Sequence, residues 1–303
     1  MKRNTAIILI VGVLLVVASS IFHKYNPNGL FLGPGSFHVS VRASAADTPA
    51  DPVEVELKQG MIYQSLSADD KKAYDVIMAD LNAHKELISH DEFPKGVNPY
   101  KIERFILNDN PGSLIANREF FNHGEVDDDL KPNYNEDASV LQGELNKAAD
   151  SIVAGFGEGD ARAKIKAIHA YLAHEVEFDY DQQNHKGRDT ELDHTAYGAL
   201  VNHKAVCDGY AAAFVLLAEK CGVEAMVVDG TATYKGVSGW SAWNVVKVDD
   251  KYYNLDNTWD ANYHRGRGDE YFGYYMVGYT QFSKDHICDL MNEPAIAKEN
   301  LEK

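Results

Sequence analysis

The sequence predicts an α+β fold in which one helix packs on an antiparallel sheet. An apolar helix begins at Cys207 and extends to about Ala218, and two strand-like runs follow it at residues 240–248 and 251–255. Two consecutive aspartates, Asp249 and Asp250, join these runs, and a two-residue connection of this kind favours an antiparallel hairpin. Upstream of Cys207 the apolar residues recur mainly at helical spacing, which predicts a helical region before the sheet.

Four helices are expected before Cys207. Ser67 can cap the first one, and acidic residues at 69 and 70 favour its positive end. Turn formers at residues 108–112 end the second, because consecutive turn residues and a proline cannot continue a helix. The predicted helices are residues 67–81, 100–107, 138–156 and 161–174. Strands are also expected at residues 224–229 and 271–276, and residues 181–193 form a polar loop beside the expected cleft.

The first residues predict a membrane helix. Residues 5–22 carry no charge and are mostly Ile, Leu, Val and Ala, and about 17 to 19 such residues are just enough to cross a bilayer. Lys2 and Arg3 precede the run and place the rest of the chain outside the cytoplasm. A cleaved signal peptide with secretion is the alternative, but the small-residue box at 43–45 lies far beyond the apolar run, so we favour an uncleaved, single-pass anchor in the cell membrane.

The sequence therefore predicts an anchored chain with a helical region before the sheet. Its segments are a signal anchor or transmembrane helix (1–22), a linker (23–60), a helical N-terminal subdomain (61–158), a core (159–290) and a C-terminal tail (291–303).

Composition narrows the function classes. The 303 residues are 45% hydrophobic and 25% charged, as in a globular protein, and the formal net charge is −17. An acidic body of this kind is not attracted to nucleic acid or to an anionic membrane surface. The three cysteines, Cys207, Cys221 and Cys288, show neither a disulfide framework nor metal-ligand spacing. We therefore expect no metal and no cofactor.

Three short segments carry a family pattern. They are residues 205–210 (AVCDGY), 241–244 (SAWN) and 256–260 (DNTWD). The pattern resembles the bacterial transglutaminase-like domain of the papain-type cysteine-enzyme superfamily, with Val-Cys-x-Gly-Tyr-Ala, then His-Ala-Trp-Asn, then Asp-x-Thr-Trp-Asp. The resemblance covers roughly residues 66–288 and is strongest from 197 to 260. It implies a papain-like core with a nucleophile helix on an antiparallel sheet.

The resemblance also implies roles for three residues. Cys207 falls on the nucleophile, and a thiol at a helix start lies where the helix dipole favours the thiolate. Asp256 falls on the acid that orients the catalytic histidine. Ser241 stands where that histidine is expected, and a hydroxyl cannot take the proton of a thiol near neutral pH.

Further candidates surround these three. Tyr197 resembles the family's aromatic residue before the nucleophile, and either lines the cleft, donates to an oxyanion or belongs to the core. Trp243 and Trp259 are better read as core or cleft wall than as catalytic groups, and they stand as candidate substrate-binding residues. Replacement bases are conceivable among nearby histidines, although each fits a surface or structural role better: His194, His203, His264 and His286.

Two functions are weighed from this pattern. The favoured one is a catalytically impaired pseudoenzyme that is tethered outside the cytoplasm and binds a peptide or protein segment, with cell-wall or surface proteins as plausible partners. The alternative is an active cysteine peptidase or acyltransferase that acts on peptide or glutamine-like amides through a Cys207 thioester. A purely structural surface module is the remaining reading.

Overall fold

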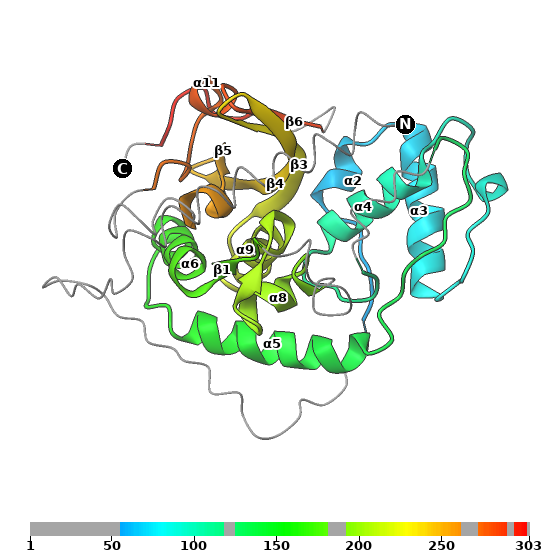
Figure 1. The fold of residues 1–303 in the computed structure, drawn as a ribbon, viewed down its shortest axis with the longest axis horizontal. Coiled ribbons are helices and arrows are strands. Elements are labelled where there is room, and N and C mark those ends of the chain that lie inside the picture. The colour runs from blue at the N-terminus through cyan, green and yellow to red at the C-terminus, as the bar shows by residue number, and fades with distance from the viewer. Residues whose placement is uncertain (1–54, 118–124, 181–191, 262–271, 290–293, 302–303) are drawn as a thin grey trace, which may run out of the picture.

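The computed structural model describes residues 55–117, 125–180, 192–261, 272–289 and 294–301 (Figure 1). Its α-helices are α2 (Met61–Ser65), α3 (Ala68–Asn82), α4 (Pro99–Asp109), α5 (Ala138–Ala154), α6 (Ala161–Glu175), α8 (Ala196–Leu200), α9 (Cys207–Lys220) and α11 (Tyr279–Phe282), with a short 3₁₀ turn at His90–Glu92. Its strands are β1 (Glu177–Phe178), β2 (Lys204–Ala205), β3 (Ala225–Tyr234), β4 (Val237–Val248), β5 (Lys251–Leu255) and β6 (His286–Cys288).

The four-stranded antiparallel sheet has the strand order β5-β4-β3-β6. The predicted hairpin between β4 and β5 is confirmed. Its two turn residues, Asp249 and Asp250, have φ angles of 50° and 59°, the left-handed pair that a type I′ turn requires. Asn244 pairs with Leu255, so Asp256 leaves the end of β5 beside β4.

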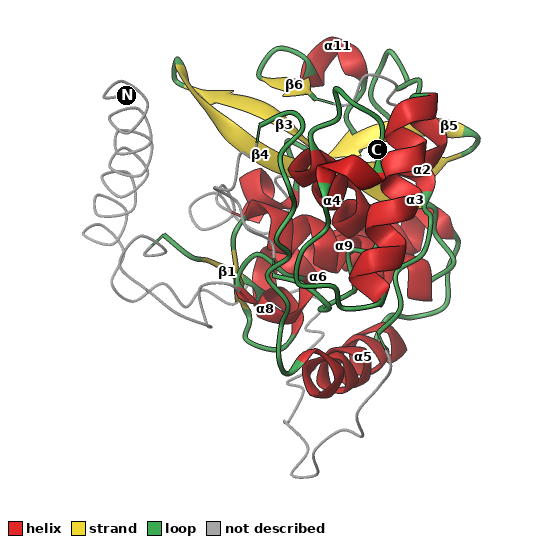
Figure 2. Ribbon diagram, turned by 90° about the vertical axis from the view of Figure 1, so that its right-hand side faces the viewer, coloured by secondary structure: helices red, strands yellow, loops and turns green. Residues whose placement is uncertain are grey.

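Helix α9 lies at the centre of the molecule and packs on β3 and β4. All of its residues from Asp208 to Ala218 are buried, which fits an apolar helix covered on every side. Helices α5, α6 and α8 cover its other faces, and Figure 2 shows these helices below the strands. The predicted helix that begins at Cys207 and its packing on an antiparallel sheet are confirmed, and with them the α+β class.

The N-terminal helices cover the opposite face of the sheet. Side chains of β4 alternate between two apolar clusters: Trp243 and Val245 pack with α2, α3 and α4, whereas Val246 and Val248 pack with the helices around α9. In Figure 1 the helices α2 to α4 lie together at one side of the molecule. An ion pair of 2.7 Å between Arg104 of α4 and Asp229 of β3 links them to the sheet.

The four predicted helices are confirmed within a few residues. Helix α3 begins where the cap was expected, because Ser67 accepts a hydrogen bond of 3.1 Å from the Asp70 N–H. Helix α2 was not expected as a separate element. The Asp109 carboxylate holds its first turn by accepting from the N–H groups of Ile62 and Tyr63, which is a tertiary cap that local sequence does not reveal.

The strand predicted at residues 271–276 is wrong for its described part, residues 272–276. The N–H groups of Gly273 and Tyr274 donate to the Asp260 carboxylate instead of to a neighbouring strand. Met276 has a φ of 55°, which breaks an extended run. The last strand of the sheet is β6, further along the chain.

Residues 5–22, the predicted anchor, lie outside the described residues, as do most of the linker and nearly all of the polar loop. Among the helices that the structure describes, none is long and apolar enough to span a bilayer.

Candidate active site

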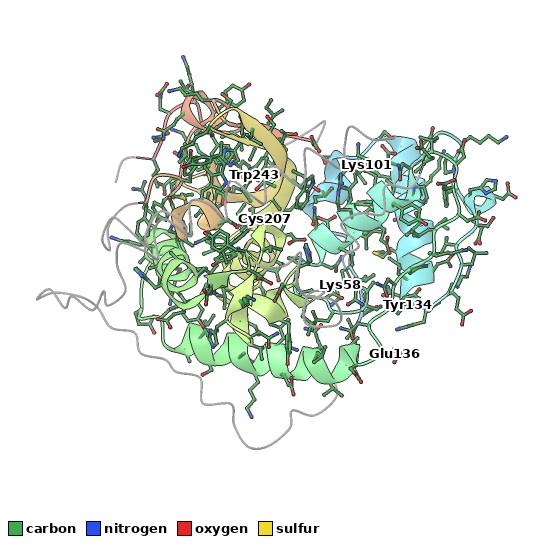
Figure 3. All side chains as sticks on the ribbon, viewed as in Figure 1. Lys58, Lys101, Tyr134, Glu136, Cys207 and Trp243 are labelled. Atoms are coloured by element: carbon green, nitrogen blue, oxygen red, sulfur yellow. The ribbon has the colours of Figure 1, made fainter. Side chains whose placement is uncertain are left out.

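Cys207 is the first residue of α9. It follows Val206 and strand β2, which pairs in parallel with β1. The close approach of this helix start to a neighbouring segment requires a glycine, because a Cβ on Gly209 would lie 2.3 Å from the Asp193 carbonyl oxygen. Figure 3 shows Cys207 at the end of α9 that faces the β3–β4 hairpin. The helix start and the sheet therefore fix the position of the sulfur.

The predicted stabilisation of the Cys207 thiolate is wrong for the resting protein. Burial raises the pKa of the Cys207 thiol well above its ordinary value, and the negative charges of Asp208 and Asp256 raise it further. Backbone N–H groups of Ala242 and Asp208 favour the thiolate but do not offset these effects. The sulfur therefore rests as a neutral thiol.

Ser241 lies on β4 opposite Gly230 and is buried, with 6% of its surface exposed. The residue after it, Ala242, presents its N–H to the Cys207 sulfur. Ser241 is thus next in sequence to a residue that contacts the sulfur, yet its side chain has no group that can accept a proton near neutral pH.

Asp256, which follows the edge strand β5, is fully buried and contacts His286 of β6, the strand at the opposite edge of the sheet. Its Oδ2 lies 3.2 Å from Nε2 of His286, and its Oδ1 accepts from the Trp259 N–H at 3.0 Å. The second ring nitrogen of His286, Nδ1, lies 2.7 Å from Oδ1 of Asp285. A carboxylate therefore faces each nitrogen of this ring.

This double contact favours the protonated form of His286. Burial opposes the charged ring, but the hydrogen bonds and charges of Asp256 and Asp285 outweigh it and raise the pKa of His286. Carboxylates only accept hydrogen bonds, so the contacts at both ring nitrogens favour the imidazolium form of the ring. An imidazolium has no lone pair with which to take a proton from the thiol.

His286 is one of the four histidines that are conceivable as replacement bases, but its contact with Asp256 is not predicted by the sequence. In the sequence, only the neighbouring Asp285 indicates that a carboxylate contacts the His286 ring. Asp256 is 30 residues away, so its contact with His286 can be seen only in the folded structure. In the described part of the chain, no imidazole nitrogen is hydrogen-bonded to the Cys207 sulfur. His264 lies outside the described residues.

Aromatic rings enclose the imidazolium. Their centroids lie at 4.1 Å (Phe282), 4.5 Å (Trp259), 5.2 Å (Trp243) and 5.4 Å (Tyr274) from the centroid of His286. Trp243 is 2% exposed and donates to Asn254 at 3.2 Å, as a core residue does. Trp259 is half-buried, so of the two tryptophans it is the one that can contact a ligand.

Tyr197 and the remaining histidines make structural contacts. The Tyr197 hydroxyl donates to Glu144 of α5 at 2.6 Å, which fits the core reading of this tyrosine. His194 lies 2.9 Å from the Asp208 carboxylate, and His203 is a turn residue with a φ of 56°. Within the described ranges, no group of three or more His, Cys, Asp or Glu side chains is arranged to hold a metal ion.

Part of the chain is similar in sequence to a known family. A sequence model of the transglutaminase-like superfamily matches residues 148–257, which include Cys207, Ser241 and Asp256. This part of the chain is therefore similar in sequence to the transglutaminase-like superfamily. Within the matched residues, Ser241 precedes the residue whose N–H reaches the Cys207 sulfur, and Asp256 contacts His286, which lies outside the match.

The relatives match this domain over a limited length. Kyphoscoliosis peptidase of Homo sapiens is 29% identical and that of Mus musculus 27% identical, each over 106 residues. The match covers 32% of this chain and only 16% of either peptidase.

Among solved structures, a TGase is 22% identical over 51% of this chain and 39% of that one, with a TM-score of 0.32. A putative cysteine protease from Cytophaga hutchinsonii is 16% identical over 38% of each chain, with a TM-score of 0.31. An arylamine N-acetyltransferase from Bacillus cereus is 16% identical over 39% of this chain and 49% of that one, with a TM-score of 0.30.

Proposed function

We propose that the transglutaminase-like domain is catalytically impaired and that the surface around Cys207 binds a peptide or protein segment without cleaving it. The observation that carries this proposal is the contact between Asp256 and His286. The acid that would orient a catalytic imidazole is already bound to an imidazolium held by a second carboxylate.

Two steps of amide chemistry need a proton carrier beside the sulfur. One group must take the thiol proton, and the same group must later protonate the leaving amine. The raised pKa of Cys207 makes the first step harder still. Loss of general acid–base assistance typically lowers a rate by about 10² to 10⁴-fold, so turnover of amides should fall below ordinary detection.

The direct test is turnover with glutamine-containing peptides and an amine acceptor. We expect ammonia release from the wild-type protein to equal that from Cys207→Ala. The wild-type protein has the sulfur but no base beside it, and the variant has no sulfur. Ammonia release or peptide cleavage that Cys207→Ala abolishes would show that the domain is an active enzyme.

A gain-of-function pair sharpens this test. Ser241→His supplies an imidazole, but Asp256 is occupied by His286. We therefore expect more activity from Ser241→His combined with His286→Gln than from either change alone. Circular dichroism must confirm that each variant folds, because a histidine at the buried position 241 overpacks the site at a cost of about 1–3 kcal/mol.

An active cysteine peptidase or acyltransferase is the second candidate. The observation in its favour is that the Cys207 sulfur lies at a helix start and receives a backbone N–H from Ala242. It requires a base, for which His264 is available in the sequence. A base with a pKa near about 7 in the pH profile of kcat/KM, lost in His264→Ala, would favour this candidate.

Peptide binding itself can be tested without knowledge of the natural partner. A peptide array that includes cell-wall peptides should give binders whose affinity survives Cys207→Ala and falls in Trp259→Ala. Val126→Ala is a suitable control, since Val126 is exposed on another part of the chain. Binding that is insensitive to Trp259→Ala would place the peptide elsewhere.

We further propose that residues 5–22 anchor the domain outside the cytoplasm, on the strength of their apolar run and the preceding Lys2 and Arg3. The full chain should resist extraction by alkaline carbonate, and protease added outside the cells should digest the domain. Mature protein that lacks the apolar run would instead indicate secretion after signal cleavage.

A further inference from the structure

Tyr274 contacts His286 and both of the carboxylates that hold its ring. The ring centroid of Tyr274 lies 5.4 Å from that of His286 and 4.8 Å from that of Trp259. In addition, its hydroxyl is bonded to Asp285 and its main chain is bonded to Asp256. One residue therefore connects the two carboxylates that face opposite nitrogens of the imidazolium.

The Tyr274 hydroxyl controls the direction of the Asp285 carboxylate. It donates to Oδ2 of Asp285 at 2.7 Å, while Oδ1 of the same carboxylate lies 2.7 Å from Nδ1 of His286. The two oxygens thus serve two different donors. The side chain of Asp285 is 27% exposed, so loss of the hydroxyl lets the carboxylate turn toward water. The hydroxyl therefore keeps Oδ1 of Asp285 directed at the ring.

The main chain of Tyr274 is itself fixed by buried groups. Its carbonyl accepts from the Asp256 N–H at 2.9 Å. Its N–H donates to the Asp260 carboxylate, at 3.0 Å to Oδ1 and 3.2 Å to Oδ2. Asp260 is fully buried, and its Oδ2 lies 2.9 Å from Nε2 of His169 on α6. The backbone that carries the hydroxyl is therefore held independently of the His286 ring.

We propose that Tyr274 is a positioning residue that keeps His286 on Asp256. Its hydroxyl directs Asp285 at Nδ1, and a ring held at Nδ1 presents Nε2 to Asp256. Tyr274 thereby acts on the titration of His286 through Asp285. In the described part of the chain, Asp256 and Asp285 are the charged groups that face this ring, and the packed elements α11 and β4 contribute uncharged aromatic rings.

The inference rests on the Asp256–His286 contact, which also carries the proposed function. The two can nevertheless fail separately, because the role of Tyr274 is measured on the His286 ring and not as turnover. Amide turnover that depends on Cys207 would refute the proposed function and leave the role of Tyr274 intact. Loss of that role would leave the contact between Asp256 and His286 in place.

The test is the exchange with water of the two ring N–H protons of His286, measured by NMR on the full chain with nitrogen-15-labelled histidine. The measurement is made below the ordinary histidine pKa of about 6.5, and the signals are assigned by their loss in His286→Gln. In Tyr274→Phe we expect exchange at Nδ1 to rise about tenfold, as the loss of a hydrogen bond gives, and exchange at Nε2 to change less than about twofold. The titration midpoint of His286 should also fall, because Asp285 then stabilises the charged ring less.

Two further variants complete the test. Tyr252→Phe is the matched control, because it removes a hydroxyl that is bonded to the Glu224 carboxylate at 2.6 Å, and it should leave both exchange rates unchanged. Asp285→Asn serves if Tyr274→Phe fails to fold. Its amide replaces one of the two acceptor oxygens by a donor, so exchange at Nδ1 should rise here too. Where both variants fold, Tyr274→Phe should add no further rise to Asp285→Asn.

The pattern at the two nitrogens separates positioning from packing. A tyrosine that only fills space would, on loss of its hydroxyl, leave both exchange rates unchanged or raise them equally. Either result in folded Tyr274→Phe would overturn the proposal. Unchanged exchange at Nδ1 in folded Asp285→Asn would overturn it as well.

Discussion

Replacement of His286 by glutamine is expected to destabilise the fold strongly. Asp256 is fully buried, and its contact with His286 at 3.2 Å supplies its counter-charge. Removal of one partner of a buried ion pair costs about 3–5 kcal/mol, because the other charge is left uncompensated. Glutamine keeps a hydrogen-bond donor and much of the side-chain volume, so we expect a loss near the lower end, about 3 kcal/mol.

The dependence on pH gives the sign of this contribution. Since Asp256 and Asp285 raise the pKa of His286 above its unfolded value of about 6.5, the folded state holds the proton more tightly. The stabilisation is fully present below about pH 6.5 and is lost as the pH rises through the folded pKa. The stability difference between wild type and His286→Gln should therefore shrink above pH 6.5.

Urea unfolding followed by far-UV circular dichroism measures both effects. A double-mutant cycle with Asp256→Asn isolates the pair, and we expect a coupling energy of about 1–3 kcal/mol. Additive losses in the cycle, or a loss under about 1 kcal/mol for His286→Gln at pH 6, would refute the ion pair. Either result would also return His286 to the list of possible bases.

Three other expectations follow from single contacts. Gly209→Ala should lower the free energy of unfolding by about 1–3 kcal/mol, because its Cβ would lie 2.3 Å from the Asp193 carbonyl oxygen; an unchanged melting temperature would contradict that close approach. Arg104→Met should cost about 3 kcal/mol in urea unfolding, since it removes the positive charge paired with the Asp229 carboxylate, which is 1% exposed. Cys207 should react with iodoacetamide at pH 7 at least about tenfold more slowly than glutathione, because its pKa is raised, and a faster reaction would show an activated thiol.

The elements that sequence predicted well are those whose signals are local. Ser67 caps α3 through its own neighbours, and the turn at Asp249 and Asp250 carries its own backbone preference. The strand expected at residues 271–276 failed for the opposite reason. Asp260 captures the N–H groups of Gly273 and Tyr274 from 13 and 14 positions away, and alternation of side chains cannot show that capture.

In the candidate site, too, some features have a local sequence signal and others depend on the folded structure. The positions of Cys207 at a helix start and of Asp256 after a strand end agree with the sequence, whereas their catalytic roles stay predictions. The charge state of the thiol was not visible, because a helix start favours the thiolate while burial and the charge of Asp208 oppose it more strongly. Burial is a property of the packed molecule and has no local sequence signal.

The presence of an aspartate at position 256 is therefore weak evidence that the domain is catalytically active. A carboxylate that is fully buried needs a counter-charge whether or not the domain turns over, and here the counter-charge comes from β6. With His286 in place, an imidazole introduced at position 241 would compete for an acid that is already paired. Recovery of amide chemistry by Ser241→His should accordingly depend on the residue at 286, and this dependence distinguishes a lost catalytic site from one that merely lacks its histidine.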